Sequence, residues 1–478
     1  MSIQIYNSLT KQKQEFQPIH PPTVKMYTCG VTVYDQCHIG HARSLYVFDM
    51  IRRYLQFRGF KVEFVRNITD VDDKIIHKAI ETKRESKDVS EEQIRLYYED
   101  MKALGVSKAD KEPKATENID EMIYYITGLI EKGYAYQSEG DVYYSVRKFE
   151  GYGKLSGQSI EKMFEAVRIE KGEKKKDPLD FALWKKSKEG EPSWDSPWGQ
   201  GRPGWHIECS CMSLKHLNCQ TLDIHAGGRD LIFPHHENEI AQSEAFTGKP
   251  FAKYWIHHGL LTINKQKMAK SSGNFITIKD AVEKYGANVL KMFFLSSHYR
   301  SPIDFSEEKI EEAGKNYMKL TRMVKAVDDF FANMSAEEKN GIKTEINSSL
   351  SSWRQSSDFF EAAMDDDFNT PKALSVLNNL ITNSNTATMR YPQILHNRSV
   401  LVSLYYERYM ALPQIAKIFN IEIFNKNVLT ELQEELLNER KEARASKDFK
   451  RSDELRDDLL KKGIMVKDTK DGQKWEKV

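Results

Sequence analysis

The chain has 478 residues, with 71 basic and 70 acidic side chains and a formal net charge of +1. At roughly 150 residues per domain, this length predicts about three domains, each able to bury its own core. No apolar run approaches the length of a membrane span, and the balanced charge excludes a uniformly basic nucleic-acid coat protein.

The N-terminal segment has no apolar signal core, so we expect a cytoplasmic protein. In that reducing compartment the five cysteines are expected to be thiols or metal ligands, not disulfides. We expect no membrane partner.

A strand, a helix and a second strand follow one another near the N-terminus. An apolar run over 24–29 stops at Gly30, apolar residues then recur every three to four positions up to Gly59, and 61–66 again has the pattern of a strand. A βαβ unit of this kind favours a parallel, doubly wound sheet, which is an α/β fold of the Rossmann type.

A helix and a hairpin interrupt this alternation. Apolar residues share one helical face over 116–133, and 134–146 has the pattern of two strands around a turn. An aromatic, turn-rich stretch then leads to an expected strand over 207–211. We therefore expect an insertion at 116–200 that splits one Rossmann domain into halves at 1–115 and 201–258.

Beyond about residue 310 the strand signals fade and helical patterns dominate. The expected helices cover 316–331, 349–364, 371–383 and 401–418, which predicts a helix bundle. Two charged helices and a β-like tail predict a small terminal module in the last fifty residues. The domains expected here are a connector over 259–315, the bundle over 316–413 and the terminal module over 414–478.

Two histidines mark the start of the first predicted helix. His38 and His41 flank Gly40 where the backbone N–H groups of a helix are unpaired and its dipole favours an anion. Both imidazoles can donate hydrogen bonds to a polyphosphate. The pattern indicates nucleotide binding, and two loop histidines without a shared task are the alternative.

A second cationic segment contains Lys265, Lys267 and Lys270, with Gly273 as a pivot. Phosphoryl or nucleotidyl transfer depends on cations placed where charge develops on the pyrophosphate. Taken alone, a solvated lysine-rich loop is the simpler interpretation of this segment.

Together, His-Ile-Gly-His at 38–41 and Lys-Met-Ala-Lys-Ser at 267–271 resemble the two signature motifs of class I aminoacyl-tRNA synthetases. Ala269 departs from the usual pattern, which has a serine there, while both lysines are present. The resemblance implies that ATP activates an amino-acid carboxylate, which is then transferred to the 3′ end of a tRNA. It assigns transition-state stabilisation to His38, His41, Lys267 and Lys270.

A glycine-rich turn follows the apolar strand expected at 221–224. By itself it is an ordinary βα turn with one carboxylate. By the same resemblance, Asp230 binds the ribose of ATP, which arrives with Mg²⁺ as a substrate. The ATP-binding set is then Gly40, Gly228, Asp230 and Lys270.

Cysteine, histidine and glutamate residues suggest a metal site. His235 and Glu239 share a helical face at i and i+4, while the zinc-protease pattern fails because Ile240 stands where its second histidine belongs. Cys29 ends the first strand, and Cys209 is expected to end the strand after the insertion, so both would reach one edge of a parallel sheet. These four side chains could bind zinc, and a surface His–Glu pair is the alternative. The remaining cysteines are expected to be packing thiols: Cys37, Cys211 and Cys219.

Four further motifs narrow the resemblance to the cysteinyl-tRNA synthetase family, and the match spans essentially the whole chain. They are Tyr27–Gly30, Arg66–Asp70, Gly204–Cys209 and Phe233–Glu239. The resemblance implies that one Zn²⁺ is held by Cys29, Cys209, His235 and Glu239, and that the sulfur of the substrate cysteine adds to it. It also implies a cysteine pocket lined by Thr69, Trp205 and His225.

The resemblance further implies that the bundle binds tRNA(Cys) and the terminal module its anticodon, in a monomer that also binds ATP and L-cysteine. Trp475 is a candidate for stacking on a base. Candidate phosphate contacts are Arg440 and Arg444, with Lys441, Lys447, Lys450 and Arg451 beside them. A solvated charged helix is the alternative. The acidic run before Pro371 suits a helix N-terminus and has no other chemistry that the sequence reveals.

Two other functions compete with tRNA charging. One is a cysteine ligase that acts on a small amine, and the other is a non-catalytic RNA-binding protein stabilised by zinc. The terminal module at 414–478 argues against the first, because such ligases lack it. The paired histidines and lysines argue against the second.

Overall fold

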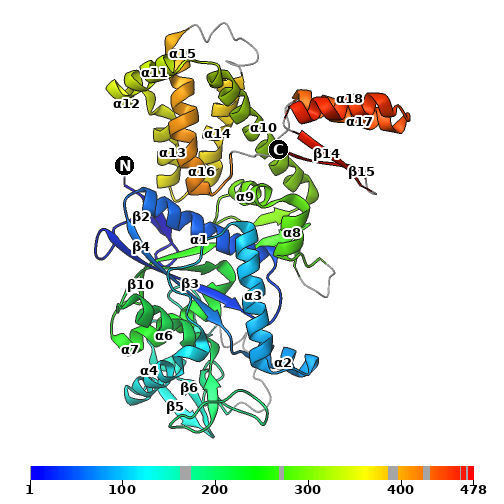
Figure 1. The fold of residues 1–478 in the computed structure, drawn as a ribbon. Coiled ribbons are helices and arrows are strands. Elements are labelled where there is room, and N and C mark those ends of the chain that lie inside the picture. The colour runs from blue at the N-terminus through cyan, green and yellow to red at the C-terminus, as the bar shows by residue number, and fades with distance from the viewer. Residues whose placement is uncertain are drawn as a thin grey trace. The chain divides into compact units, whose positions relative to one another are not determined.

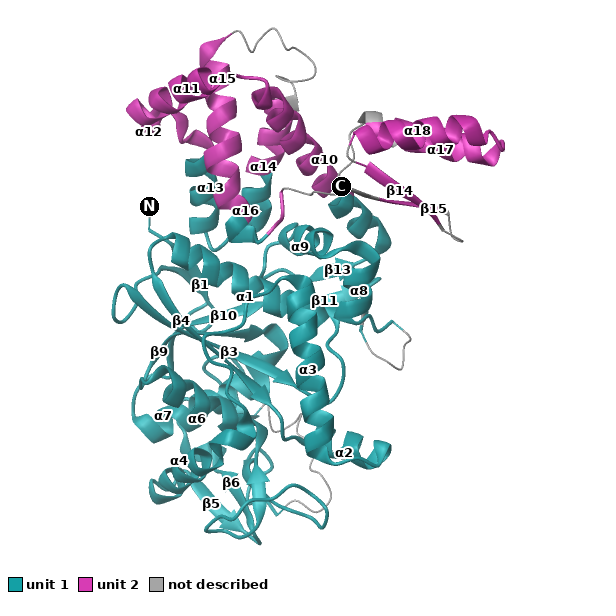
Figure 2. Ribbon diagram, in the orientation of Figure 1, with its two compact units in different colours: residues 1–314, 357–375, 417–420 teal, residues 315–356, 376–416, 421–478 magenta. Residues whose placement is uncertain are grey.

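The computed structural model describes residues 2–161, 174–268, 274–385, 397–423, 431–462, 464–469 and 472–477. The chain divides into two compact units, coloured separately in Figure 2. Unit 1 comprises Met1–Gly314, Ser357–Ser375 and Lys417–Asn420. Unit 2 comprises Lys315–Ser356, Val376–Ala416 and Ile421–Val478.

The centre of unit 1 is a parallel four-stranded sheet with the order β10-β9-β3-β4 (Figure 1 and Figure 2). Helix α1 (Ile39–Phe57) connects β3 to β4 and confirms the predicted βαβ unit. The chain places β4 on one side of β3 and the later strands on the other, so ligands are expected at the carboxyl ends between β3 and β9. The strands are β3 (Thr23–Thr32), β4 (Lys61–Thr69), β9 (Leu222–Gly228) and β10 (Ala252–His258).

Further elements of unit 1 surround this sheet. The antiparallel pair β1 (Gln4–Asn7) and β2 (Gln12–Glu15) precedes it. Helices α2 (Asp73–Thr82) and α3 (Ser86–Leu104) follow β4, where the sequence analysis named no element. The Asp72 side chain caps α2 by accepting a hydrogen bond from the backbone N–H of Lys74.

The insertion forms its own antiparallel sheet with the order β5-β6-β7-β8. Helix α4 (Ile119–Glu131) and the hairpin β5 (Ala135–Ser138) and β6 (Asp141–Tyr144) confirm the predicted helix and hairpin. Strands β7 (Phe181–Lys186) and β8 (Gly201–Pro203) complete the sheet. The insertion therefore extends three residues past its expected boundary at 200, because β8 pairs with β7.

The strand expected over 207–211 is wrong, since these residues lie within helix α6 (Trp205–Leu217). Helix α6 is buried on nearly every side, packing against β4 and α7 (Glu237–Thr247). A helix without a polar face lacks the 3.6-residue alternation by which helices are recognised in a sequence. Apolar and polar residues instead alternate over 207–211, and this alternation resembles that of a strand.

The connector begins where β10 ends. Strand β11 (Leu261–Ile263) pairs with β12 (Gln266–Lys267) on one side and with β13 (Ile303–Phe305) on the other. Helices α8 (Ile278–Tyr285) and α9 (Ala287–Leu295) lie between β12 and β13 in the chain. Residues 269–273 of the lysine-rich loop lie outside the described residues.

Helices dominate the rest of the chain, as predicted, including α10 (Glu307–Ala332). Helix α11 (Ala336–Ser348) was not predicted, and its capping box at Ser335 and Glu338 is the sequence signal for it. The others are α12 (Leu350–Trp353), α13 (Gln355–Asp365), α14 (Thr370–Asn385), α15 (Arg398–Tyr406), the π-helical turn Glu407–Ala411 and α16 (Leu412–Phe419). Residues 357–375 of the range expected for the bundle belong to unit 1, as do residues 417–420 of the range expected for the terminal module.

The terminal module has the predicted order of two helices and a β-like tail, and the tail forms a hairpin. Its elements are α17 (Glu431–Ala445), α18 (Phe449–Lys461), β14 (Ile464–Thr469) and β15 (Gly472–Lys477). Leu437, Leu459, Ile464 and Val466 form its small core. Among the described residues, no helix has both the length and the apolar character needed to cross a membrane.

The packing of α4 yields a stability prediction. Leu129 is fully buried in the core shared by the insertion and the sheet, whereas Tyr124 on the same helix is 67% exposed. We expect Leu129→Ala to lower the free energy of unfolding by about 2–5 kcal/mol through the cavity it leaves. Chemical denaturation measures the change, and Tyr124→Ala is the matched control. Equal effects of the two substitutions would contradict this packing.

Candidate active site and metal centre

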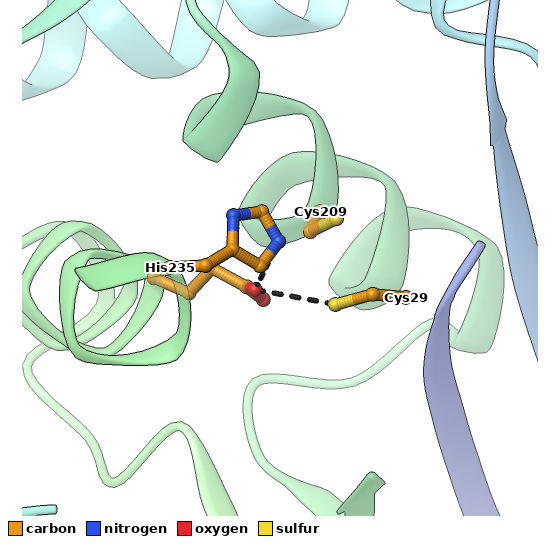
Figure 3. A group of neighbouring side chains, drawn as sticks. Cys29, Cys209 and His235 are labelled. Carbon is orange, nitrogen blue, oxygen red and sulfur yellow. Dashed lines mark hydrogen bonds and ion pairs between the residues drawn. The ribbon is translucent and has the colours of Figure 1, made fainter. Parts of the chain in front are cut away.

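Four side chains from separate parts of the chain meet at the carboxyl end of β3 (Figure 3). Cys29 lies on β3 and Cys209 on α6, while His235 lies in the turn Ile232–His236 before α7 and Glu239 lies in the first turn of α7. Their candidate ligand atoms all lie within 4.8 Å of one another. All four are the residues expected from the sequence, although Cys209 comes from a helix.

The contacts within this cluster leave donor atoms available. The Glu239 Oε1 atom lies 2.9 Å from Nε2 of His235 and 3.4 Å from the Cys29 sulfur. Nevertheless, the buried Nε2 of His235 makes no hydrogen bond of acceptable geometry. Two sulfurs, one imidazole nitrogen and one carboxylate oxygen form a donor set that suits zinc. The residues present therefore fit the metal that the resemblance implies.

The Glu239 carboxylate is fully buried, and two histidines keep it ionised. Burial by itself would raise its pKa, but His225 and His235 hold that pKa well below its usual range. His225 donates through Nε2 to the Oε2 atom of Glu239 at 2.7 Å. His225, which was predicted to line the cysteine pocket, thus lies behind a candidate ligand and orients it.

His236 is a further residue that the sequence analysis did not assign. Its Nε2 lies 3.4 Å from the Cys29 sulfur, and its Nδ1 lies 2.8 Å from Nε2 of His257. His236 and His225 also form a second possible ligand group with Cys29 and Glu239. The adjacent histidines at 235 and 236 were a signal for this arrangement, but their spacing does not show which one faces the cluster.

Asn67 fixes the backbone around Cys29 and was also missed. Its Oδ1 accepts hydrogen bonds from the Tyr27 hydroxyl at 2.9 Å and from the backbone N–H of Gly30 at 2.7 Å. A Cβ atom on Gly30 would lie 1.5 Å from the Asn67 carbonyl oxygen, so only glycine fits there. The close approach of β3 and β4 therefore depends on this glycine.

The other two expected pocket residues also lie around the cluster. The Thr69 hydroxyl donates to Oε2 of Glu208 at 2.7 Å, and both residues are buried. Trp205 is 39% exposed, and its ring stacks on His235 with the centroids 4.1 Å apart. Trp205 thus contributes an apolar surface that solvent reaches, next to a candidate metal ligand.

The histidine pair lies in the first turn of α1. His38 is the N-cap, and its Nδ1 accepts hydrogen bonds from the backbone N–H of Gly40 at 3.1 Å and of His41 at 3.4 Å. Nδ1 of His41 accepts in turn from the backbone N–H of His38 at 3.2 Å. Because both Nδ1 atoms are acceptors, the proton of each neutral ring is on Nε2. Each ring therefore has one N–H donor for a ligand.

The remaining ATP-binding candidates are only partly described. Asp230 is exposed in the turn after Gly228, which ends β9. Lys267 lies on β12, but its side chain is outside the described residues, as is all of Lys270. Met268, between these lysines, lies against Gly40, since its Cε is 3.5 Å from the position of a Cβ there.

The terminal module corrects one of the RNA-binding predictions. Arg440 has no exposed side-chain surface and donates to both carboxylate oxygens of Asp468 and to Gln473. It fastens α17 to the β14–β15 hairpin and is not available to a phosphate. The sequence shows the charge of Arg440 but not that the hairpin covers it. Arg444 keeps 40% of its side chain exposed beside Asp468, and Trp475 is half-buried against the core of the module.

Comparison with known proteins identifies related domains in this chain. The class I (C) tRNA synthetase catalytic domain matches residues 15–315. A DALR domain matches 359–404, and the cysteinyl-tRNA ligase anticodon binding domain matches 427–475.

Curated relatives match over their whole length. The chain is 48% identical to the cysteine–tRNA ligase of Thermodesulfovibrio yellowstonii over 491 residues, covering 99% of each protein. It is 47% identical to that of Geobacillus thermodenitrificans over 480 residues, covering 100% of this chain and 99% of the relative.

Solved structures with the same fold are more distant in sequence. Mycobacterium tuberculosis methionyl-tRNA synthetase, in complex with methionyl-adenylate, has a TM-score of 0.61 at 12% identity and covers 83% of this chain and 92% of its own. A putative arginyl-tRNA synthetase from Campylobacter jejuni has a TM-score of 0.56 at 14% identity, covering 84% and 94%. At these identities the likeness establishes the fold alone.

The environment of the paired histidines gives a pH prediction. Burial lowers the pKa of His38 to about 4 and that of His41 to about 3, where His38 and Lys74 add to the effect. In ring-nitrogen NMR we expect titration midpoints near pH 4 for His38 and near pH 3 for His41, with His38→Gln and His41→Gln spectra providing the assignments. As pH falls below the unfolded value near 6.5, the unfolded state protonates first, so these residues reduce stability between about pH 6.5 and 4. A midpoint near pH 6.5 for either ring would contradict this environment.

Proposed function

This chain is a member of the cysteine–tRNA ligase family of class I synthetases, and we propose that it activates L-cysteine with ATP and transfers the cysteine to the 3′ end of tRNA(Cys). The observation that carries the proposal is the cluster of half-buried Cys29 with buried Cys209, His235 and Glu239, in the same unit as the histidine turn of α1. A thiol-binding site and a polyphosphate site together suit the activation of cysteine.

Selection of cysteine over serine explains the composition of the cluster. The two amino acids are nearly isosteric, and shape discrimination in a pocket supplies only about 1–3 kcal/mol. A preference of roughly 10⁴-fold requires about 5.5 kcal/mol. Cys29, Cys209, His235 and Glu239 would hold one Zn²⁺, which supplies preferential bonding to sulfur over a hydroxyl oxygen. Thr69 and Trp205 lie beside this site, where they would hold the rest of the substrate.

The activation step uses the groups at the start of α1 and in the lysine-rich loop. The cysteine carboxylate attacks the α-phosphorus of ATP, and the bond from that phosphorus to the bridging oxygen of pyrophosphate breaks. His38 and His41 would donate through Nε2–H to phosphate oxygens as charge develops, and Lys267 and Lys270 would neutralise the leaving pyrophosphate. The two imidazoles need no change of protonation to do this, because both are neutral. Asp230 would accept a hydrogen bond from the ribose, and Mg²⁺ would enter with ATP.

The transfer step requires tRNA, and the second half of the chain supports this acceptor. The match at 427–475 to the anticodon binding domain favours tRNA over a small amine, and the match at 15–315 to the catalytic domain favours an enzyme over a non-catalytic RNA-binding protein. Arg444 and Trp475 remain candidates for RNA contact, whereas Arg440 is no longer a candidate because its side chain is buried. We further propose that the protein acts in the cytoplasm as a monomer, where its five free thiols suit a reducing environment.

Metal content tests the cluster independently of activity. We expect about one zinc per chain in the parent protein and in Cys211→Ala, because Cys211 is buried on α6 but lies outside the cluster. Cys209→Ala, two residues earlier on the same helix, should lose the metal while its circular dichroism stays parental. Elemental analysis after exhaustive dialysis measures the ratio. Equal zinc in the two variants would exclude Cys209 as a ligand.

Amino-acid specificity tests the function itself. We expect cysteine-dependent ATP–pyrophosphate exchange to exceed the serine-dependent rate by at least about 10⁴-fold without any editing step. Charging assays with tRNA(Cys), a non-cognate tRNA and a small amine then identify the acceptor. Equal rates of exchange with serine and cysteine would contradict a role of the metal in amino-acid selection. Transfer to the small amine alone would show that the amine, and not tRNA, is the acceptor.

A further inference from the structure

A buried arginine joins the helix of the paired histidines to the connector. Arg43 lies on α1 two residues after His41 and has no exposed surface. Its Nη1 donates to the carbonyl oxygens of Gly259 at 2.7 Å and Leu260 at 3.0 Å, and its Nη2 donates to those of Tyr299 at 3.1 Å and Ser301 at 2.6 Å. One guanidinium therefore bonds four backbone carbonyls from two separate segments.

Burying the Arg43 guanidinium in this way carries a large free-energy penalty for a contact that would only support the fold. All four acceptors are neutral carbonyls, and the Nε atom of Arg43 is buried without a partner among the described atoms. Burial lowers the pKa of this arginine to about 10, which still leaves it charged at neutral pH. Buried charges without counter-charges are strongly disfavoured, and an apolar residue would pack the same space without that penalty. What the guanidinium supplies is a planar fork that fixes both segments at once.

The two segments are the beginning and the end of the connector. Gly259 lies two residues before the start of β11, and Ser301 lies two residues before the start of β13, which pairs with β11. A Cβ atom on Gly259 would lie 2.3 Å from the carbonyl oxygen of Ser301, so the segments are in the closest possible contact. The lysine-rich loop leaves this small sheet through β12.

The chain after the lysine-rich loop is also bonded to the start of α1. The backbone N–H of Ile39 donates to the carbonyl of Ile276 at 3.0 Å, and that of Ile278 donates to the carbonyl of Cys37 at 2.9 Å. The histidine turn and both ends of the loop thus form one bonded assembly, in which Arg43 supplies the side-chain contact.

The acidic run at 365–367, to which the sequence assigned no chemistry, also contacts the connector. Asp367 is fully buried, and its two carboxylate oxygens accept from the Tyr299 hydroxyl at 2.7 Å and from Nε of Arg300 at 2.6 Å. The Tyr299 carbonyl therefore accepts a hydrogen bond from Arg43, and its hydroxyl donates one to Asp367. The turn around Tyr299 is therefore fixed by two side chains. Because this turn leads into β13, which pairs with β11, it also fixes the small sheet from which the lysine-rich loop leaves through β12.

We propose that Arg43 is a positioning residue for adenylate formation, which holds the connector and its lysines at the separation from His38 and His41 that a single ATP requires. This inference rests on the proposed function. Both motifs act on the same polyphosphate, so a displacement of about 1 Å between them is enough to lower the rate by about 10²-fold. The metal cluster lies on β3, α6 and the start of α7 and makes none of these contacts, so cysteine binding should be separable from the effect.

Kinetics of the full-length enzyme test this role. We expect Arg43→Gln to lower the kcat of cysteine-dependent ATP–pyrophosphate exchange by about 10²-fold. Arg43→Lys keeps the charge but not the fork, so its loss should be smaller, about tenfold. The KM for cysteine and the zinc content should stay near parental values in both variants. A kcat loss with an unchanged KM is the signature of a contribution made in the transition state.

Two controls separate positioning from loss of stability. Arg53→Gln alters another arginine of α1, whose partners are Asp49 and Ser107 and not the connector. Leu129→Ala destabilises a core cluster that contains no residue of the connector. Both should exchange at the parental kcat below their unfolding temperatures.

Each contrary outcome has a distinct meaning. A folded, zinc-loaded Arg43→Gln enzyme with parental kcat would overturn the inference and leave the proposed function intact. Parallel loss of zinc, cysteine binding and kcat would overturn it as well, because Arg43 would then only support the fold. A parent protein without cysteine-dependent exchange would refute the proposed function and this inference with it.

Discussion

The structure depends on keeping an ionised carboxylate buried at the carboxyl edge of a parallel sheet. Glu239 is inaccessible to solvent, and its charge is tolerated only because two imidazoles face it. His225 bonds one of its oxygens at 2.7 Å, and His235 lies 2.9 Å from the other. An unpaired carboxylate in that position would be neutralised or solvated, and the two thiols beside it would lose their anionic neighbour. The histidine-rich core around the site follows from this requirement.

The topology explains why this edge carries the site. The order β10-β9-β3-β4 reverses direction beside β3, and a crevice opens at the carboxyl ends where the connections diverge. Cys29 is near the end of β3, the histidine turn of α1 follows β3 directly, and Gly228 ends β9. The topology therefore places the groups proposed to bind sulfur next to those proposed to bind phosphate. Helix α6, the turn Ile232–His236 and helix α7 carry the other three candidate ligands.

The acidic run shows how one short segment can alter the domain organisation. Asp365 accepts from Tyr54 and Arg58, Asp366 pairs with Lys13, and Asp367 accepts from Tyr299 and Arg300. Each aspartate has its own partner in unit 1, and residues 357–375 accordingly belong to that unit. The sequence alone suggests only a helix N-terminus, because pairing with residues 67 to 353 positions away leaves no local pattern.

The sequence by itself determined the local elements and the chemistry of the key residues. The βαβ unit, α4, the hairpin that follows it and the terminal module were predicted from periodicity and turn residues, which are local properties of the chain. The motifs also named the four cluster residues. Only the tertiary structure decided that Cys209 comes from a helix, that Asn67 and His236 support the cluster, and that Arg440 is buried. These facts depend on which distant segments cover a residue, and burial by tertiary packing is not encoded in the periodicity of any one segment.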